Sequence, residues 1–388
     1  MPRLDQDIFL IAAVRTPIGK FGGALASLTA PQLGVASARA TIERSGIDAA
    51  KIDEVIFGNA RQAGVGPNSA RQIAIKSGLR HEVPAYTVNQ ACGSGLRAIM
   101  NAADQIRLGQ AQVVLAGGTE SMSNTPYMLP RVRWGTKMGN QELVDGMYRD
   151  GFLCPLADEM MGATAETLAD RYKISRSEQD EFAMQSQKKA ERAYAENRFA
   201  NEIVPLEKLQ RDEHPRFDTD LGSLARLPPV FRKDGTVHAG NSSGITDGAS
   251  SMLVASGEAV KKNGLKPMAR VIGYAQAGVD PKIMGIGPVP ATQNLLRDTG
   301  IKLSDVDLIE LNEAFAAQVL ACDRELHFDM SKVNVHGGAI ALGHPIGCTG
   351  ARITTTLLHA LQSHDKTLGL ATLCISGGMG LSMLVERV

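Results

Sequence analysis

Two segments of the chain follow the same order of elements, and this internal repeat limits the fold more than any other feature. In the first, a predicted strand at residues 87–89 leads into ACGSGLRAIMNAADQIRLG, then an apolar strand at 113–116 and a glycine pair. In the second, residues 333–335 lead into GGAIALGHPIGCTGARITTTLLHAL, then a strand at 368–375 and another glycine pair. A duplicated unit of strand, glycine-rich turn, helix and buried strand gives this pattern. The sequence therefore predicts two related α/β halves.

Alternating strands and helices also precede the first repeat. Residues 8–14 and 54–57 have the apolar character of strands, while residues 32–44 and 70–77 have the spacing of amphipathic helices. This order is typical of an α/β sheet covered by helices. Because 388 residues exceed what one hydrophobic core usually serves, we expect two or three domains.

The stretch between the repeats has a different character. From about residue 121 to 241 it contains PYMLPRVRWGTKMG, a charged helical segment near 175–197, and the tract HPRFDTDLGSLARLPPVFRKDG. We interpret it as an excursion with small helices of its own that lies over the sheet. The strand-like style returns in GNSSGITDGASSMLVAS, with residues 251–255 expected to be buried.

Charge and hydropathy exclude several classes of protein. Lys plus Arg and Asp plus Glu both number 41, so no overall field favours nucleic acid or an anionic membrane. No stretch approaches the roughly 20 apolar residues of a membrane span, and the opening MPRLDQDIFL lacks the features of a secretory signal. The five cysteines are odd in number and contain no CxxC pair. We therefore expect a cytoplasmic protein with free thiols that binds neither nucleic acid nor membrane.

Cys92 is the cysteine whose surroundings most favour chemistry. It lies in NQACGSGLRA, after a predicted strand and at the start of a predicted helix. Backbone N–H groups and the helix dipole favour a thiolate there, and Gly93 and Gly95 leave space for a substrate. A buried, inert cysteine is the alternative, and this motif alone does not decide between the two. A dinucleotide-binding loop is disfavoured, because the strand at 113–116 ends in glycine rather than in the Asp or Glu that would bind a ribose.

His344 stands in GGAIALGHPIGCTGAR, a turn dense in glycine. Such a loop suggests backbone brought close to a ligand with the imidazole held at the turn, although a histidine that merely caps the turn is the alternative. The remaining histidines occupy ordinary loop or helix settings without the spacing of a zinc site: His81, His214, His238, His327, His336, His359 and His364. We expect no metal.

Two further polar residues follow predicted strands. Cys374 ends the strand at 368–375 and enters ISGGMG, where a thiol is a candidate proton carrier. Asn312 follows an apolar run at 307–311, where its amide can hold a water or an oxyanion. Asn312 as a helix N-cap is the alternative, and the two roles are compatible.

Together these motifs resemble the thiolase family. The matching segments are ACGSG, GGTESMS, GNSSGITDGA, NEAFA, GGAIALGHPIGCTGAR and CISGGMG, with IMGIGPVPA at 283–291. They extend from about Val14 to the end of the chain. The resemblance implies an acyltransferase of fatty-acid and lipid metabolism. Such an enzyme cleaves 3-ketoacyl-CoA by thiolysis or condenses acetyl-CoA to acetoacetyl-CoA.

The resemblance also implies the architecture. Thiolases have duplicated α/β/α halves, each a mixed five-stranded sheet between helices, plus an inserted loop domain. Here the N-terminal half would comprise residues 1–120 completed by 242–268. A CoA-binding loop domain would occupy 121–241, and the C-terminal half 269–388. The family implies a homodimer or homotetramer, with CoA as substrate and product and no permanently bound cofactor.

Carried over to this sequence, the resemblance assigns four reactive side chains. Cys92 would be the acylated nucleophile and His344 its base, giving ping-pong kinetics. Cys374 would move the α-proton of acetyl-CoA. His344 and a water held by Asn312 would form one oxyanion hole, and the backbone N–H groups of Cys92 and Ser376 the other.

The resemblance further implies a binding groove. CoA would contact the following residues: Arg216, Ser223, Phe231, Ala239 and Ser243. The acyl end of the substrate would be framed by the following residues: Met161, Met284, Ala314 and Phe315. Methionine suits an adaptable acyl pocket, although ordinary core packing is the alternative.

Two positions depart from the family pattern. Many members read CIGGGMG where this chain reads CISGGMG, and Ser376 would be strained if that site required a positive φ. At Met160 the short-chain biosynthetic members commonly carry a histidine. Its absence favours the broad 3-ketoacyl-CoA thiolases over an enzyme restricted to acetoacetyl-CoA.

Two rival interpretations belong to different classes. A ketoacyl-synthase-like condensing enzyme shares the duplicated fold but usually pairs its cysteine with two histidines, whereas here Asn312 occupies the second position. A non-catalytic acyl-CoA-binding protein on the same fold is disfavoured because all four reactive side chains are present.

Overall fold

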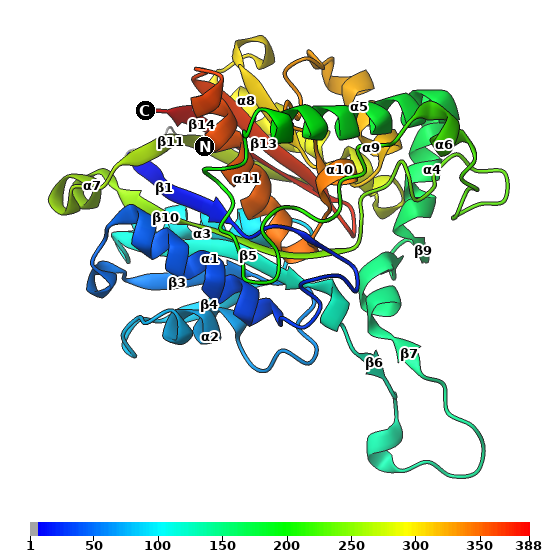
Figure 1. The fold of residues 1–388 in the computed structure, drawn as a ribbon, viewed down its shortest axis with the longest axis horizontal. Helices are drawn as coiled ribbons and strands as arrows, with labels where there is room; N and C mark the ends of the chain where they lie inside the picture. The colour runs from blue at the N-terminus through cyan, green and yellow to red at the C-terminus, as the bar shows by residue number, and fades with distance from the viewer. Residues whose placement is uncertain (1–6) are drawn as a thin grey trace.

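A ten-stranded mixed sheet forms the centre of the protein in the computed structural model, which describes residues 7–388 (Figure 1). One half of the sheet contains, in spatial order, β4 (Ala85–Val88), β3 (Glu54–Gly58), β5 (Val113–Ser121), β10 (Thr246–Ser256) and β1 (Ile8–Arg15). The other half contains, from its edge inward, β12 (Leu308–Leu311), β13 (Leu368–Ile375), β14 (Met379–Arg387) and β11 (Pro267–Gly278). The short strand β2 (Gly19–Lys20) pairs with β10. The expectation about a signal segment falls largely on residues 1–6, outside the described residues.

The strands pair in the same pattern in both halves. β4, β3 and β5 are parallel to one another, and β10 and β1 then run antiparallel. In the second half β12 and β13 are parallel, and β14 and β11 run antiparallel. The predicted duplication and α/β class are confirmed.

The second half differs from the expected five strands. The segment predicted as a strand at 333–335 makes only an isolated parallel bridge between Ile309 and Val333. Asn334 has a φ of 46°, and its side chain rather than the next backbone groups binds the N–H and carbonyl of Leu311 on the edge strand. The two halves also form one continuous sheet rather than two, because β1 pairs antiparallel with β11.

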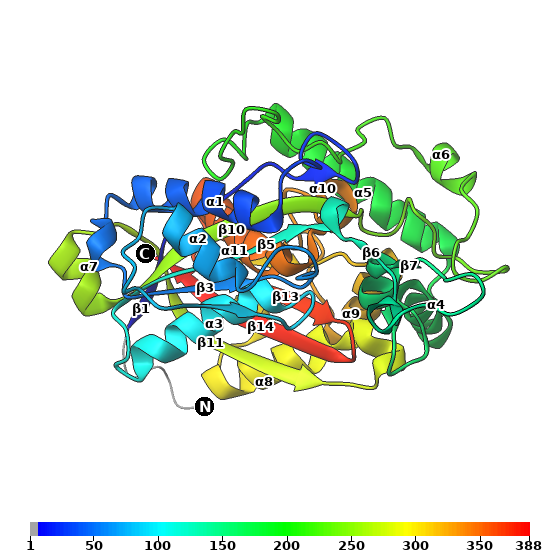
Figure 2. The same cartoon turned by 90° about the horizontal axis from the view of Figure 1, so that it is seen from below.

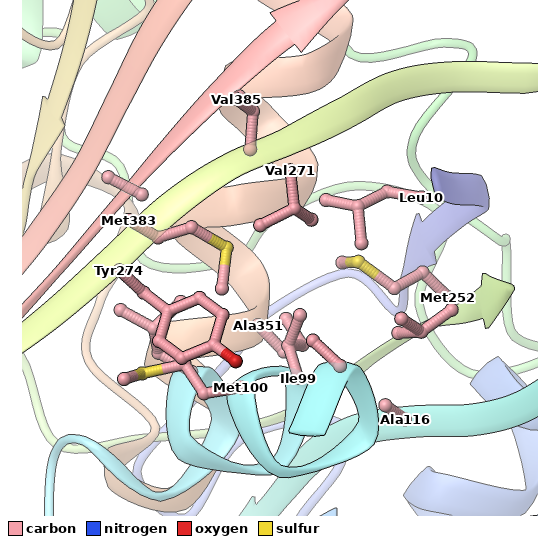
Figure 3. Packing of buried hydrophobic residues seen from close by; sticks show 14 of the residues in the cluster. Leu10, Ile99, Met100, Ala116, Met252, Val271, Tyr274, Ala351, Met383 and Val385 are labelled. Atoms are coloured by element: carbon pink, nitrogen blue, oxygen red, sulfur yellow. The ribbon is translucent and has the colours of Figure 1, made fainter. Parts of the chain in front are cut away.

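Two helices pack between the halves of the sheet. These are α3 (Ser94–Arg107), which follows β4, and α11 (Ile346–Ser363), its counterpart in the second half. Every residue of α11 from Ile346 to Leu361 is buried. The largest hydrophobic cluster joins both helices to strands of both halves, and Figure 3 shows Ile99, Met100 and Ala351 of the helices between strand residues.

Side chains alternate across the strands, as a sheet covered on both faces requires. On β10, Met252 and Val254 contact the α3–α11 layer, while Leu253 and Ala255 face the opposite layer. That opposite layer contains α1 (Ala30–Ser45) and α2 (Ser69–Lys76). The outer face of the second half is covered by α8 (Pro288–Thr299) and α9 (Ala316–Leu326). Figure 2 shows α1 and α2 on one side of the molecule and α8 on the other.

The backbones of α3 and α11 approach closely at glycine. A Cβ at Gly350 would overlap the backbone N of Leu96, and a Cβ at Gly118 would overlap the carbonyl O of Gly347. The strand expected at 113–116 continues through the glycine pair, so residues 117–118 lie inside β5. The glycines serve close packing between layers rather than a change of chain direction.

The remaining elements are short or belong to the connection between β5 and β10. Those outside this connection are η1 (Ala49–Lys51), α7 (Gly257–Asn263), η5 (Pro281–Ile286), η6 (Leu303–Asp305) and α10 (Ala339–Leu342). Those within it are η2 (Met122–Asn124), β6 (Tyr127–Met128), η3 (Val132–Trp134), β7 (Val144–Asp145), η4 (Tyr148–Phe152), β8 (Leu153–Cys154), β9 (Glu159–Met160), α4 (Met161–Tyr172), α5 (Arg176–Ala195) and α6 (Leu221–Ala225). No helix in the described part of the chain is both long and apolar enough to cross a membrane.

Part of this connection does not lie over the sheet as expected. Residues 127–145, which include β6 and β7, project from the body of the molecule (Figure 1). We call this segment the arm. Its exposed apolar side chains include Trp134 at 87% and Met138 at 100% of their accessible surface. The division into domains at 120, 241 and 268 stays a prediction.

The close approach at Gly350 leads to a testable expectation. Gly350→Ala should lower the free energy of unfolding by roughly 3 kcal/mol, because backbone atoms of Leu96 would have to move. Gly222→Ala in the exposed α6 is the control, since its Cβ would meet no atom closer than 3.4 Å, and it should be neutral or stabilise by up to about 1 kcal/mol. Urea denaturation followed by circular dichroism measures both. Equal stability of the two variants would contradict the packing described above.

Candidate active site

Cys92 lies in a tight turn between β4 and α3. Ala91 has a φ of 45°, and the turn is closed by hydrogen bonds from the N–H groups of Gly93 and Ser94 to the carbonyls of Gln90 and Ala91. Helix α3 begins at Ser94, so Cys92 precedes the helix by two residues. Cys92 is half-buried, whereas the other four cysteines are buried. The chain thus presents one accessible thiol on a constrained turn.

The expected preference for the thiolate of Cys92 is wrong for the free protein. Burial raises the pKa of the Cys92 thiol above its ordinary value. A hydrogen bond from the backbone N–H of Ser376 and the positive charge of Arg61 act in the opposite direction but are smaller. Desolvation outweighs the local N–H groups, so the thiol holds its proton at neutral pH and needs a base.

His344 lies between α10 and α11 and is held by hydrogen bonds on both sides. Gly343 before it has a φ of 100°, and the backbone N–H of His344 donates to the carbonyl of Gly244 at 3.1 Å. The Nδ1 atom is 2.6 Å from the hydroxyl of Thr349. The Nε2 atom is buried and finds no hydrogen-bond partner among residues 7–388. One ring nitrogen is anchored and the other is available.

The surroundings of His344 keep it neutral. Burial, together with the positive charges of Arg352 and Arg61, lowers the pKa of its imidazole to about 3. A neutral imidazole with an unpartnered nitrogen can accept a proton. His344 is therefore chemically suited to act as a base.

Asn312 directly follows β12 and has a side-chain amide that is buried and unpaired. Its backbone N–H donates to the carbonyl of Thr372 at 3.0 Å, while neither side-chain polar atom has a partner in the described chain. The interpretation as an N-cap is wrong, because α9 begins at Ala316 with Phe315 as its N-cap. A buried amide without protein partners is suited to hold a water or a substrate oxygen.

Cys374 is the last residue but one of β13 and is 1% exposed. Its pKa is raised well above the ordinary value by burial, and also by the neighbouring Cys92 and Cys322. The expectation of a thiol that titrates near neutral pH is therefore wrong. Such a thiol ionises only when a stronger base or a newly formed anion takes its proton.

The loop after Cys374 accommodates serine without strain. Ser376 is not among the residues with positive φ, while Gly377 and Gly378 have φ values of 85° and 84°. The glycine requirement thus begins one residue after Ser376. Since the N–H of Ser376 binds Cys92, the two halves of the molecule meet at this point.

A cavity of about 490 Å³ is lined by residues that pack near Cys92 and His344. Among the residues expected at a binding groove, those that line it are Arg216, Phe231, Ala239, Ser243, Met161 and Phe315. Its wall also includes Phe152 and Ile245, which pack in the same cluster as Cys92, and Gly244, which accepts from His344.

Three expected binding residues do not line this cavity. Met284 and Ala314 pack against Cys374 in a buried cluster that Phe315 also contacts. Ser223 lies elsewhere, in α6, where its N–H and hydroxyl bind Asp220 in a capping box. Ser223 thus stabilises a helix start in this structure.

Glu120, which sequence reasoning did not single out, joins the turn after β3 to the first turn of α11. One carboxylate oxygen accepts from Asn59 Nδ2 at 2.6 Å and from the N–H of Arg61 at 3.0 Å. The other accepts from the N–H of Ala60 at 3.1 Å and of Gly347 at 2.8 Å. An acidic residue inside GGTESMS, at the end of an apolar strand, was the available signal. Thr349 was likewise missed, although it stands five residues after His344.

Residues 7–388 contain no group of three or more His, Cys, Asp or Glu side chains arranged to hold a metal ion. The arrangement instead offers a thiol, a neutral imidazole, a second thiol and a buried amide. These groups are suited to covalent transfer combined with proton abstraction.

Comparison with known proteins gives a consistent result. Residues 8–258 match the family profile described as thiolase, N-terminal domain, and residues 265–387 match thiolase, C-terminal domain. Acetyl-CoA acetyltransferases of Pseudomonas aeruginosa and Escherichia coli are each 51% identical to the chain, covering 98% and 99% of it and 100% of each relative.

Solved structures agree as well. The Bacillus anthracis acetyl-CoA acetyltransferase is 45% identical with a TM-score of 0.96, covering 99% of both chains. Human mitochondrial 3-ketoacyl-CoA thiolase in complex with CoA is 44% identical with a TM-score of 0.97, covering 100% of this chain and 99% of that one.

Proposed function

Because this chain belongs to the thiolase family, we propose that it transfers acyl groups reversibly between CoA thioesters through an acyl-enzyme on Cys92. Relatives that match over the full chain are acetyl-CoA acetyltransferases, so the chain is an acyltransferase. Two observations support the mechanism: Cys92 meets Ser376 and Cys374, and His344 has a buried Nε2 without a partner among residues 7–388.

In the first half-reaction His344 Nε2 takes the proton of Cys92. The thiolate attacks the thioester carbonyl, and the backbone N–H groups of Cys92 and Ser376 stabilise the oxyanion. CoA leaves as a thiolate and takes a proton from Cys374. The acyl group is then on Cys92, the imidazolium is on His344 and the thiolate is on Cys374, so charge and protons balance.

In the second half-reaction the Cys374 thiolate removes the α-proton of acetyl-CoA. Its raised pKa supports this role, because a poorly solvated thiolate is a strong base toward a weak carbon acid. The enolate oxygen receives hydrogen bonds from His344 Nε2–H and from a water held by Asn312. The enolate attacks the acyl carbonyl, and Cys92 leaves and recovers its proton from His344. The reverse sequence is thiolysis of a 3-ketoacyl-CoA.

The cavity is the proposed site for CoA. Its wall contains Lys20, His214 and Arg216, whose side chains supply positive charge or N–H donors suited to bind phosphate. Apolar residues such as Phe231 line the remainder. The contact of Ser223 with CoA stays a prediction, as does the broad acyl range inferred from Met160, which also lines the cavity.

The separate roles of the two thiols give a direct test. Cys374→Ala should lower the exchange of the methyl protons of acetyl-CoA with deuterated solvent by at least about 100-fold, because the base is lost. It should still form acyl-Cys92, because CoA is a good leaving group as a thiolate. Cys92→Ala should form no acyl-enzyme.

Cys348→Ala is the control, since it removes a buried thiol of α11 that the mechanism does not use. Exchange is followed by mass spectrometry of acetyl-CoA. Exchange at the wild-type rate in Cys374→Ala would contradict the proposal.

We also propose a homo-oligomer, in which a second copy of the chain covers the arm. The support is its apolar exposure, since Trp134 and Met138 project into solvent. The five free cysteines favour a reducing cytoplasm, where the enzyme would serve lipid metabolism.

Replacing both Trp134 and Met138 by Ser should reduce the molar mass measured by light scattering after size exclusion. Leu108→Ser, which removes a 71% exposed apolar residue outside the arm, is the control and should leave the mass unchanged. An unchanged mass in the arm variant would exclude the arm as the interface.

A further inference from the structure

The hydroxyl of Thr349 is the only described group that hydrogen-bonds the ring of His344. Thr349 is fully buried in the first turn of α11, five residues after His344. Its Oγ1 is 2.6 Å from His344 Nδ1 and 2.9 Å from the carbonyl O of Pro345. The backbone N–H of Thr349 also donates to that carbonyl at 2.9 Å. The hydroxyl is therefore fixed in position by its own helical turn.

The single proton of this hydroxyl decides the tautomer of His344. A carbonyl oxygen can only accept, so the contact with Pro345 requires that Thr349 donate its proton there. Donation to the carbonyl four residues earlier is the ordinary arrangement of threonine in a helix. The hydroxyl can then only accept from the ring, which means that Nδ1 carries a hydrogen. The lone pair of the neutral ring is consequently on Nε2, the atom without a partner among residues 7–388.

We propose that Thr349 is a positioning residue that holds His344 in the tautomer with its proton on Nδ1 and its lone pair on Nε2. The inference rests on the proposed function, in which Nε2 takes the proton of Cys92 and later returns it. With Nδ1–H fixed, only Nε2 gains and loses a proton during the reaction.

A hydroxyl suits this task better than a carboxylate would. A carboxylate beside Nδ1 orients a histidine and also stabilises its cation, whereas a neutral hydroxyl orients the ring with little stabilisation of charge. The charged groups that act on His344 are Arg352 of α11 and Arg61, and both disfavour the imidazolium. The imidazolium that His344 forms by taking the proton of Cys92 is therefore stabilised only while a thiolate anion is present. His344 then returns the proton readily to Cys92.

The test compares Thr349→Val, which keeps the shape but removes the hydroxyl, with Thr349→Ser, which keeps the hydroxyl. The rate of Cys92 acylation by acetyl-CoA in a single turnover should fall roughly 10- to 100-fold in Thr349→Val, the usual size for loss of an orienting partner. The steady-state KM for acetyl-CoA should change little. Thr349→Ser should restore most of the rate. Nitrogen NMR of histidine-labelled full-length enzyme should show His344 protonated on Nδ1 in the wild type and a mixture of tautomers in Thr349→Val.

Thr354→Val is the matched control. Thr354 is equally buried in α11, and its hydroxyl donates to the carbonyl of Gly350 at 2.9 Å without contacting His344. Thr354→Val should change the free energy of unfolding in urea by about as much as Thr349→Val does. It should leave both the acylation rate and the tautomer of His344 unchanged.

Three results would overturn the inference. These are a wild-type His344 protonated on Nε2, an unchanged tautomer in Thr349→Val, or a Thr349→Ser enzyme as slow as Thr349→Val. Failure of the proposed function looks different, because Cys92 would then not be acylated even in the wild type, while the NMR spectrum would still report the tautomer.

Discussion

The close crossing of α3 and α11 is the constraint on which the rest of the site depends. Each helix follows a turn that carries a reactive residue, Cys92 in one half and His344 in the other. Because glycine at Gly350 and Gly118 lets backbone meet backbone, the two turns are brought together at the same end of the helix pair. Glu120 adds hydrogen bonds that join the turn after β3 to the first turn of α11, which follows His344. Side-chain packing alone would leave the turns further apart.

Burial is the second physical effect that shapes the chemistry. It raises the pKa of both thiols and lowers that of His344, so every reacting group is uncharged in the free protein. Protons then move only in response to a new charge on a neighbour. In the proposed two-step transfer, the imidazolium and the Cys374 thiolate both arise in the first half-reaction and are both neutralised in the second. In the proposed mechanism, the N–H of Ser376, which binds Cys92, and the unpaired amide of Asn312 stabilise the oxygen charge that develops.

Much of this architecture could be predicted from local patterns. The strand expected at 368–375 has those bounds as β13, and the charged segment near 175–197 forms α5. The four reactive residues could be singled out because each stands where a strand or a turn ends. Contacts between distant segments could not be predicted in this way. Glu120 binds Gly347 across 227 positions, and no local pattern indicates that the glycines at 117–118 serve packing between layers. The direction of the Cys92 pKa shift could also not be predicted from the sequence, because desolvation depends on tertiary packing.

The central claim is that Cys92 carries the acyl group, and mass spectrometry of the acid-quenched enzyme after mixing with acetyl-CoA tests it most directly. The account predicts an acetyl group on the peptide that contains Cys92, together with protection of that thiol from alkylation by iodoacetamide. An acetyl group confined to another residue, or alkylation of Cys92 at the same rate with and without acetyl-CoA, would contradict the account.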